Sequence, residues 1–159
     1  MKSKKFSNRI IEIFKKNGFV LSEPDVLLDS EHIIQRSGEN FRRSMLTFKN
    51  ENGKVMCLRP DLTVASCIKF LENKSKSKIF YSGQAYRRSE KEGSDLIKDQ
   101  LGIEILGSKN KLQDDFKVIK TILNSAVSIK GKKIKIKVGD IGLFKKLINS
   151  LDMPERWKL

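Results

Sequence analysis

Three short groups of polar residues stand where predicted strands end or where one face of a strand turns polar. The first is the segment 58–63, Leu-Arg-Pro-Asp-Leu-Thr, in which Pro60 fixes the chain direction as a strand ends. Asp61 and Thr63 would then emerge at the edge of a sheet, where a carboxylate and a hydroxyl could hold the ammonium group of a ligand. Because an aspartate at this place also suits the N-cap of the helix that follows, a purely structural role of Asp61 stays open.

The second and third groups lie on two further predicted strands. Arg87 closes the first of them, and its planar guanidinium suits a carboxylate or a phosphate. On the second strand a period of two places Gln100, Gly102 and Glu104 on one face, about 6.6–6.8 Å apart per step. Since glycine lacks a side chain, we expect free space above Gly102. The pattern therefore predicts that this face of the strand forms the base of a site for a small polar ligand.

Glu104 needs a partner, because an unpaired buried carboxylate is costly. It either pairs with Arg87 as a structural element or waits for a ligand that carries an amine or an imidazole. Residue patterns of other chemistries are missing from the sequence: it has neither a Gly-rich phosphate loop nor a Ser/His/Asp or Cys/His arrangement. With one histidine and two cysteines outside metal-ligand spacing, we expect neither a metal site nor a cofactor.

Hydrophobic periodicity predicts the elements that must position these groups. An Asn-Gly pair at 52–53 predicts a hairpin turn. The order of elements favours an α+β domain on an antiparallel sheet instead of alternating βαβ units. We expect helices at 6–17, 30–37 (closed by Gly38), 62–72, 111–128 and 143–151, and strands at 19–21, 45–48, 55–58, 79–87, 100–106 and 134–138.

Length and composition narrow the class of protein. A chain of 159 residues with 38% hydrophobic content predicts one folded domain, residues 1–159. The formal net charge of +14 makes polyanions a candidate partner, but the lysines are dispersed along the chain, so we do not expect nucleic-acid binding. We expect a cytoplasmic protein, since the sequence shows neither a signal peptide nor a membrane span, and we expect Cys57 and Cys67 to be buried, reduced thiols.

The three polar groups, in this order, resemble the catalytic core of histidyl-tRNA synthetase, a class II synthetase, and of its paralogue, the ATP phosphoribosyltransferase regulatory subunit. The resemblance runs through most of the chain and includes the segments 45–48, 52–53, 58–63 and 100–107. In that family an acid, a threonine, an arginine, a glutamine and a glutamate at the corresponding places contact histidine. The resemblance therefore implies a histidine site formed by Asp61, Thr63, Arg87, Gln100 and Glu104.

Departures from the synthetase pattern favour the regulatory subunit. Synthetases carry an arginine for ATP and an aromatic residue for adenine in the loop and return strand of motif 2, but this sequence has neither between Arg88 and Gln100. Segments 138–144 and 151–157 are similar to regulatory-subunit patterns. This resemblance implies a non-catalytic subunit that activates the short-form ATP phosphoribosyltransferase catalytic subunit and senses L-histidine in the first step of histidine biosynthesis. The alternative is a fragment of a histidyl-tRNA synthetase that activates histidine with ATP.

The resemblance also implies an architecture. We expect a class II synthetase-like antiparallel sheet flanked by helices, incomplete at the C-terminus because both families continue through further strands, and without an anticodon-binding domain. Class II cores pair through their motif 1 region, which corresponds here to about Phe19 to Leu28. We therefore expect self-association through this region.

Overall fold

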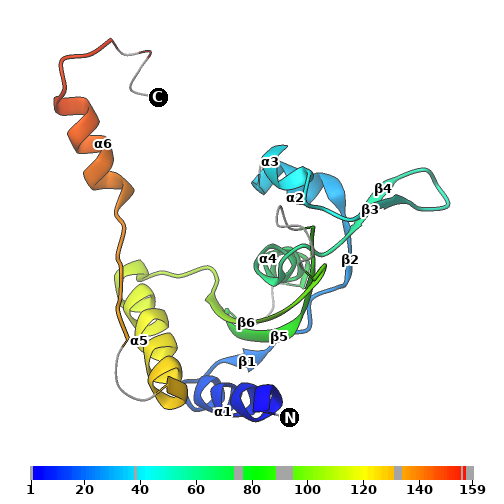
Figure 1. The fold of residues 1–159 in the computed structure, drawn as a ribbon, viewed down its shortest axis with the longest axis horizontal. Coiled ribbons are helices and arrows are strands. Elements are labelled where there is room, and N and C mark those ends of the chain that lie inside the picture. The colour runs from blue at the N-terminus through cyan, green and yellow to red at the C-terminus, as the bar shows by residue number, and fades with distance from the viewer. Residues whose placement is uncertain are drawn as a thin grey trace.

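The computed structural model describes residues 2–37, 39–73, 77–88, 95–130, 134–154 and 156. Helices and strands follow one another largely as the periodicity predicts (Figure 1). The elements are α1 (Lys2–Lys16), β1 (Val20–Leu21), β2 (Leu27–Asp29), α2 (Ser30–Ser37), α3 (Glu39–Arg42), β3 (Thr47–Lys49), β4 (Val55–Leu58), α4 (Leu62–Asn73), β5 (Lys78–Tyr86), β6 (Ile97–Ile105), α5 (Lys111–Lys130) and α6 (Ile141–Ser150).

The strands form two sheets of three strands each. In the first, β5 lies between β1 and β6, parallel to β1 and antiparallel to β6. The β5–β6 ladder runs from the Lys78–Ile105 pair to the Tyr86–Ile97 pair, so β6 begins three residues before the expected start. In the second sheet β4 lies between β2 and β3, antiparallel to both. The expected α+β fold on a largely antiparallel sheet is confirmed.

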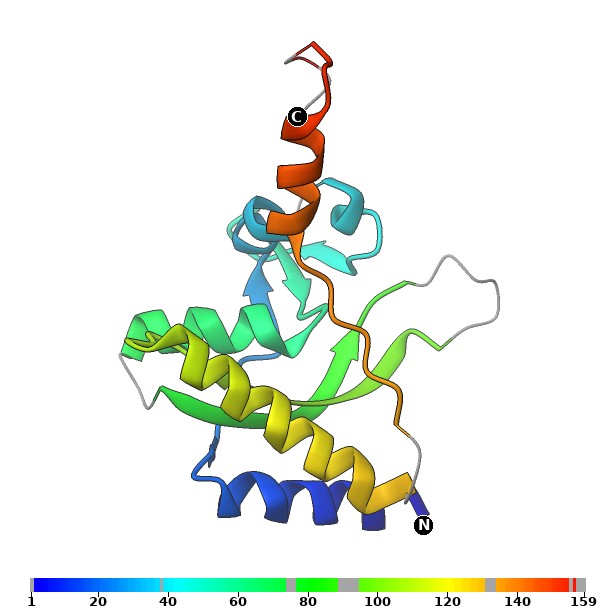
Figure 2. The same cartoon turned by 90° about the vertical axis from the view of Figure 1, so that its left-hand side faces the viewer.

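Helices cover both faces of the first sheet, and the alternation of β5 and β6 decides which side chains each helix meets. Helix α4 lies on one face, while α1 and α5 lie on the other (Figures 1 and 2). On the α1 and α5 side, Phe14 and Phe19 pack with Phe80 and Ile103, and Leu101, Ile105 and Val118 pack around this cluster. The face of β6 opposite Gln100 and Glu104 is therefore apolar. On the α4 side Leu62 packs with Tyr81 and Ala85.

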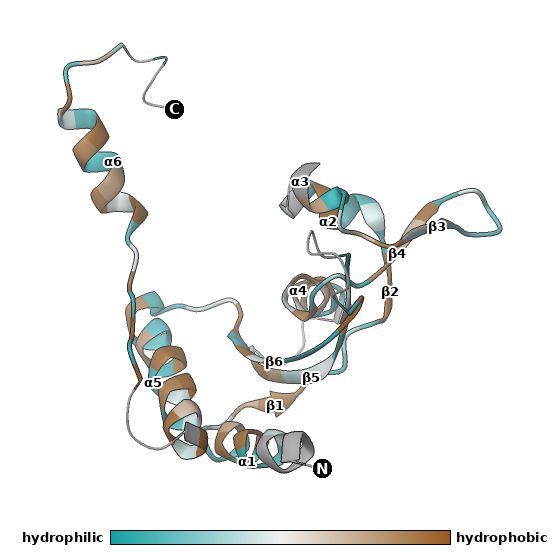
Figure 3. Ribbon diagram, in the orientation of Figure 1, coloured by the Kyte–Doolittle hydropathy of each residue, from teal (hydrophilic) through white to brown (hydrophobic). Residues whose placement is uncertain are grey.

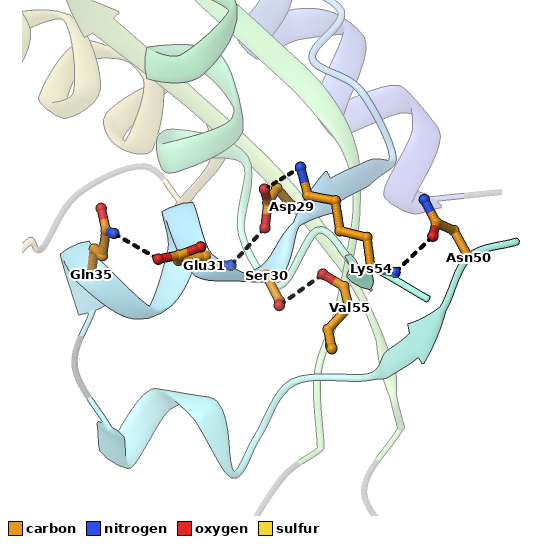
Figure 4. Close-up of polar contacts among 7 residues, drawn as sticks. All are labelled: Asp29, Ser30, Glu31, Gln35, Asn50, Lys54 and Val55. Carbon is orange, nitrogen blue, oxygen red and sulfur yellow. Dashed lines mark hydrogen bonds and ion pairs between the residues drawn. The ribbon is translucent and has the colours of Figure 1, made fainter. Parts of the chain in front are cut away.

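The β3–β4 hairpin confirms the turn predicted from its Asn-Gly pair. The Asn50 side-chain oxygen accepts hydrogen bonds from the amides of Asn52 (3.1 Å) and Lys54 (2.9 Å), and Gly53 has a φ of 75°, in the left-handed region that favours glycine. Figure 4 shows the hairpin held to the start of α2. There Lys54 Nζ lies 2.7 Å from Asp29 Oδ2 and holds the pKa of that carboxyl below its usual value.

A second set of contacts in the same region begins α2. Ser30 Oγ donates to the Val55 carbonyl oxygen at 2.9 Å, and the Glu31 amide donates to Asp29 Oδ1 at 2.9 Å (Figure 4). The bond of the Glu31 amide satisfies a group that a helix N-terminus leaves open, and the bond of Ser30 ties this end of α2 to β4. The helix spans the expected residues 30–37, and Gly38, the expected stop, lies outside the described residues.

The expected strand at 134–138 is wrong. These residues are not part of any strand in the described chain, although Ile134, Ile136 and Val138 alternate with lysines. Alternation makes an extended segment amphipathic, but a strand also needs a hydrogen-bonding neighbour, and the two described sheets do not supply one.

Helix α6 follows this segment and stands away from the sheets (Figure 1). It begins at Asp140, whose Oδ1 accepts from the Gly142 amide at 2.7 Å, and none of its residues is buried. Apolar residues occur along α6, as the hydropathy colouring in Figure 3 shows, and Ile141, Leu143, Phe144 and Leu147 are exposed. Among the described residues, none of the helices combines the length and apolar character needed to cross a bilayer.

Candidate functional site

The five residues predicted to bind a ligand come from three elements around the first sheet. Asp61 directly precedes α4 and Thr63 lies in its first turn, Arg87 directly follows β5, and Gln100 and Glu104 lie on β6. All five side chains are half-buried, so each is partly open to solvent. The structure brings four of them together and places the fifth, Arg87, farther along the sheet.

The hydroxyl of Tyr81 joins two of these residues, Thr63 and Glu104. Tyr81 lies on β5 directly across from Gly102 and is 4% exposed. Its hydroxyl lies 2.9 Å from Thr63 Oγ1 and donates to Glu104 Oε1 at 3.2 Å, and the nearby Gln100 side chain acts to lower the pKa of Tyr81. Burial raises the pKa of Tyr81 to about 12, so the phenol stays protonated at neutral pH.

Sequence reasoning missed Tyr81, and it also misjudged the space above Gly102. A Cβ on Gly102 would lie 2.6 Å from Tyr81 Cζ and 2.8 Å from Cε2, so the tyrosine ring occupies the place expected for a ligand. The prediction of free space above Gly102 is therefore wrong, because this glycine makes room for the Tyr81 side chain of the neighbouring strand. A large aromatic residue opposite a glycine could have indicated that the space is filled. To recognise such a pair one must know the strand register, which the sequence alone does not give.

Asp61 serves as the N-cap of α4. Its Oδ1 accepts a hydrogen bond from the Val64 amide at 2.9 Å, which is the structural alternative considered from the sequence. The amide of Leu62, the first residue of α4, donates to Gln100 Oε1 at 3.2 Å. In this way Gln100 ties the start of α4 to β6. No partner is recorded for Asp61 Oδ2 among the described residues.

Arg87 does not pair with Glu104. Its amide donates to the Leu96 carbonyl at 2.9 Å beyond the end of the ladder, whereas Glu104 lies opposite Ile79. Eight residues separate Ile79 from Arg87, which corresponds to about 26 Å along a strand. The structural ion pair considered from the sequence is therefore excluded. Met45, before β3, forms a bridge to Arg87 and places it beside the second sheet.

Arg59 is a second residue that sequence reasoning left without a role. It is 8% exposed, its Nε donates to the Gln84 carbonyl at 2.9 Å, and its Nη1 donates to the Pro24 carbonyl. Its own amide donates to the Val26 carbonyl at 2.8 Å. A Cβ on Gly83 would lie 2.9 Å from Arg59 Nη2, so this glycine makes room for the guanidinium. Arg59 thereby joins the segment before β2 to the strand that carries Tyr81.

The side chains around Tyr81 can act as hydrogen-bond acceptors. Carboxylate, hydroxyl and amide oxygens converge near Tyr81, and these groups accept hydrogen bonds from ammonium and ring N–H groups. Within the described ranges, His, Cys, Asp and Glu residues do not gather in a group of three or more that could hold a metal ion. Cys57 is buried, as expected, and burial raises its pKa to about 11, while Cys67 is only half-buried.

The fold and the polar face of its first sheet define a class II aminoacyl-tRNA synthetase-like core. A crystal structure described as an ATP phosphoribosyltransferase regulatory subunit/histidyl-tRNA synthetase from Bacillus halodurans matches with a TM-score of 0.82 and 19% identity, over 98% of this chain and 41% of that chain. Residues 1–158 match the family model of histidyl-tRNA synthetase, and the chain belongs to this family.

Curated relatives carry two different names. The ATP phosphoribosyltransferase regulatory subunit of Allorhizobium ampelinum is 26% identical over 160 residues, which covers 96% of this chain and 41% of the relative. The histidine–tRNA ligase of Sulfurisphaera tokodaii is 28% identical over 161 residues, which covers 97% of this chain and 37% of that protein. The chain thus spans about two fifths of the length of these relatives.

Proposed function

We propose that this chain binds L-histidine as part of a non-catalytic regulatory subunit of ATP phosphoribosyltransferase. The observation that carries the proposal is the half-buried cluster of hydrogen-bond acceptors around the Tyr81 hydroxyl. Histidine offers an ammonium group and an imidazole N–H, which such acceptors complement. The contacting residues would be Asp61, Thr63, Arg87, Gln100 and Glu104.

Each residue has a role that follows from its chemistry. Glu104 and the Oδ2 atom of Asp61 would accept from the cationic and N–H groups of histidine, because charge-assisted hydrogen bonds are strong ones. The second amide N–H of Gln100 remains a donor. Arg87 lies beyond the far end of β5, nearer to Gln100 than to Glu104, and its long side chain would reach back along the sheet to the carboxylate end, for which a guanidinium offers paired donors.

Two observations favour a regulatory subunit over a synthetase. Residues 89–99 carry neither an arginine nor an aromatic side chain, which are the residue types that the resemblance assigns to ATP and adenine. Relatives of this sequence are also named as regulatory subunits. The chain would then sense histidine and, with the short-form catalytic subunit as partner, activate the first step of histidine biosynthesis. We assign it to the cytoplasm, as one class II-like core domain over residues 1–159, without a membrane or nucleic-acid partner.

The second candidate is a fragment of a histidyl-tRNA synthetase that activates histidine with ATP. The similarity to the Sulfurisphaera tokodaii histidine–tRNA ligase favours this candidate. The two candidates share the histidine site and differ in whether ATP binds beside it.

Calorimetric titration of the chain with L-histidine, and separately with ATP and magnesium, tests the proposal. L-Lysine, which carries the same ammonium and carboxylate groups without an imidazole, is the control ligand. We expect heat from histidine and none from ATP or lysine. Binding of both histidine and ATP would support the synthetase fragment, and a lack of histidine binding would contradict both candidates.

A further inference from the structure

The Tyr81 hydroxyl has two side-chain hydrogen-bond partners, Thr63 and Glu104, and only one proton to give. A phenol has one proton and two lone pairs, whereas a carboxylate only accepts. The proton of Tyr81 therefore goes to Glu104 Oε1, at 3.2 Å. The other partner, Thr63, must therefore donate to a lone pair of the Tyr81 oxygen.

The orientation of Gln100 agrees with this assignment. Its Oε1 accepts from the Leu62 amide at 3.2 Å, so its NH₂ group is the end that can face Tyr81, and Gln100 acts to lower the pKa of Tyr81, as a donor does. Thr63 has a single hydroxyl proton, which at 2.9 Å from the Tyr81 oxygen is used in the bond to that oxygen. The donor and acceptor of every bond in the cluster are then fixed.

This fixed direction determines what the cluster can offer a ligand. Thr63 is left with lone pairs and Glu104 with its Oε2 atom, and both of these are acceptors. A ligand placed against them must donate hydrogen bonds. A ligand that presents a lone pair instead would leave polar groups unpaired in a half-buried site, and such mismatches discriminate strongly between ligands.

We propose that Tyr81 is a positioning residue that holds Thr63 and Glu104 as acceptors and thereby restricts the site to ligands whose ring carries an N–H donor. This inference rests on the proposed histidine site and adds the basis of its selectivity. Tyr81 itself is covered by the sheet and by α4, as its burial and its packing with Leu62 and Ala85 indicate, so it acts through its two neighbours.

Tyr81→Phe tests the inference because it keeps the ring that packs between β5 and α4 and removes only the hydroxyl. The ligands are L-histidine and 2-thiazolyl-L-alanine, whose ring has a similar shape and a nitrogen acceptor but lacks an N–H. The readout is the ratio of the two dissociation constants by calorimetry. Tyr86→Phe is the matched control, since within the described residues the Tyr86 hydroxyl donates to Gln84 Oε1 on the exposed part of the same strand and not to the Tyr81 cluster.

We expect the original chain and Tyr86→Phe to prefer histidine, and the preference to fall about tenfold in Tyr81→Phe, the value of one hydrogen bond of about 1.4 kcal/mol. The ratio falls because the Thr63 hydroxyl becomes free to donate to the thiazole nitrogen. If Tyr81 had only a structural role, Tyr81→Phe would weaken the binding of both ligands equally and leave the ratio of the two dissociation constants unchanged.

An unchanged ratio in Tyr81→Phe would overturn the inference while leaving histidine binding intact. A lack of histidine binding by the original chain would overturn the proposed function and the inference with it. If circular dichroism shows that Tyr81→Phe does not fold, Thr63→Val takes its place, because it removes the acceptor that Tyr81 is proposed to hold toward the ligand. The ratio should then fall in Thr63→Val, and an unchanged ratio there would also overturn the inference.

Discussion

At the scale of single residues, Glu104 is the group whose removal should cost most histidine affinity. We expect Glu104→Ala to weaken binding about ten- to hundredfold, because a hydrogen bond to a charged group contributes about 1.5–3 kcal/mol. Calorimetric titration measures this loss. Asp99→Ala is the matched control, since Asp99 lies on the same strand but alternates to the other face. Equal affinity of the Glu104→Ala and Asp99→Ala chains would remove Glu104 from the site.

The residue types were easier to predict than their partners. Period-two alternation correctly placed Gln100 and Glu104 on one face of β6, because strand geometry alone fixes this. Tyr81 was missed because tyrosine is common in strands. Its contact with Gly102 depends on the register of β5 and β6, which pairs the two residues. The pairing of Arg87 with Glu104 depends on the same register, which excludes it.

At the scale of elements, the start of α4 combines a structural and a proposed binding role in Asp61. Asparagine caps helices about as well as aspartate, but it lacks the charge. We expect Asp61→Asn to keep the thermal stability of the chain while weakening histidine binding. Asp61→Ala should also lower the free energy of unfolding by about 0.5–2 kcal/mol. Thermal melts and calorimetry together separate the two roles, and full affinity in Asp61→Asn would leave Asp61 as a cap alone.

The fit between β5 and β6 at Gly102 should be intolerant of any side chain. A Cβ there would lie 2.6 Å from Tyr81 Cζ, and an aromatic ring held between strand and helix cannot move aside easily. We expect Gly102→Ala to lower the free energy of unfolding by about 1–3 kcal/mol, measured by urea denaturation. Gly139→Ala is the control, since a Cβ at Gly139 meets nothing within 4 Å. Similar midpoints for both variants would contradict the described packing.

Elements with local signals were predicted well, and those that depend on distant partners were not. Helix α2 and the β3–β4 hairpin follow from nearby residues, such as the Asn50 side chain that closes the turn. The segment 134–138 has an equally regular pattern but no neighbouring strand in the described chain. A pattern can state which face of a strand is apolar, but it cannot state whether another strand is there to pair with it.

At the scale of the whole molecule, the motif 1 region is the surface that we propose for self-association. β1 and β2 are edge strands of their sheets, and Leu21 and Leu27 are 50% and 52% exposed. Exposed edges with apolar side chains favour pairing between copies. We expect sedimentation velocity to show a dimer that the double change Leu21→Asp and Leu27→Asp converts to a monomer. Leu71→Asp, at an exposed leucine of α4, is the control, and a monomeric original chain would contradict this proposal.

The central claim is that histidine occupies the face of the first sheet around Tyr81. The most direct test is nuclear magnetic resonance of the ¹⁵N-labelled chain during titration with L-histidine. The account predicts that amide signals of Leu62, Gln100, Gly102 and Glu104 shift along one saturable curve, while ATP with magnesium leaves them in place. Saturable shifts confined to residues outside this face, or identical shifts with ATP, would contradict it.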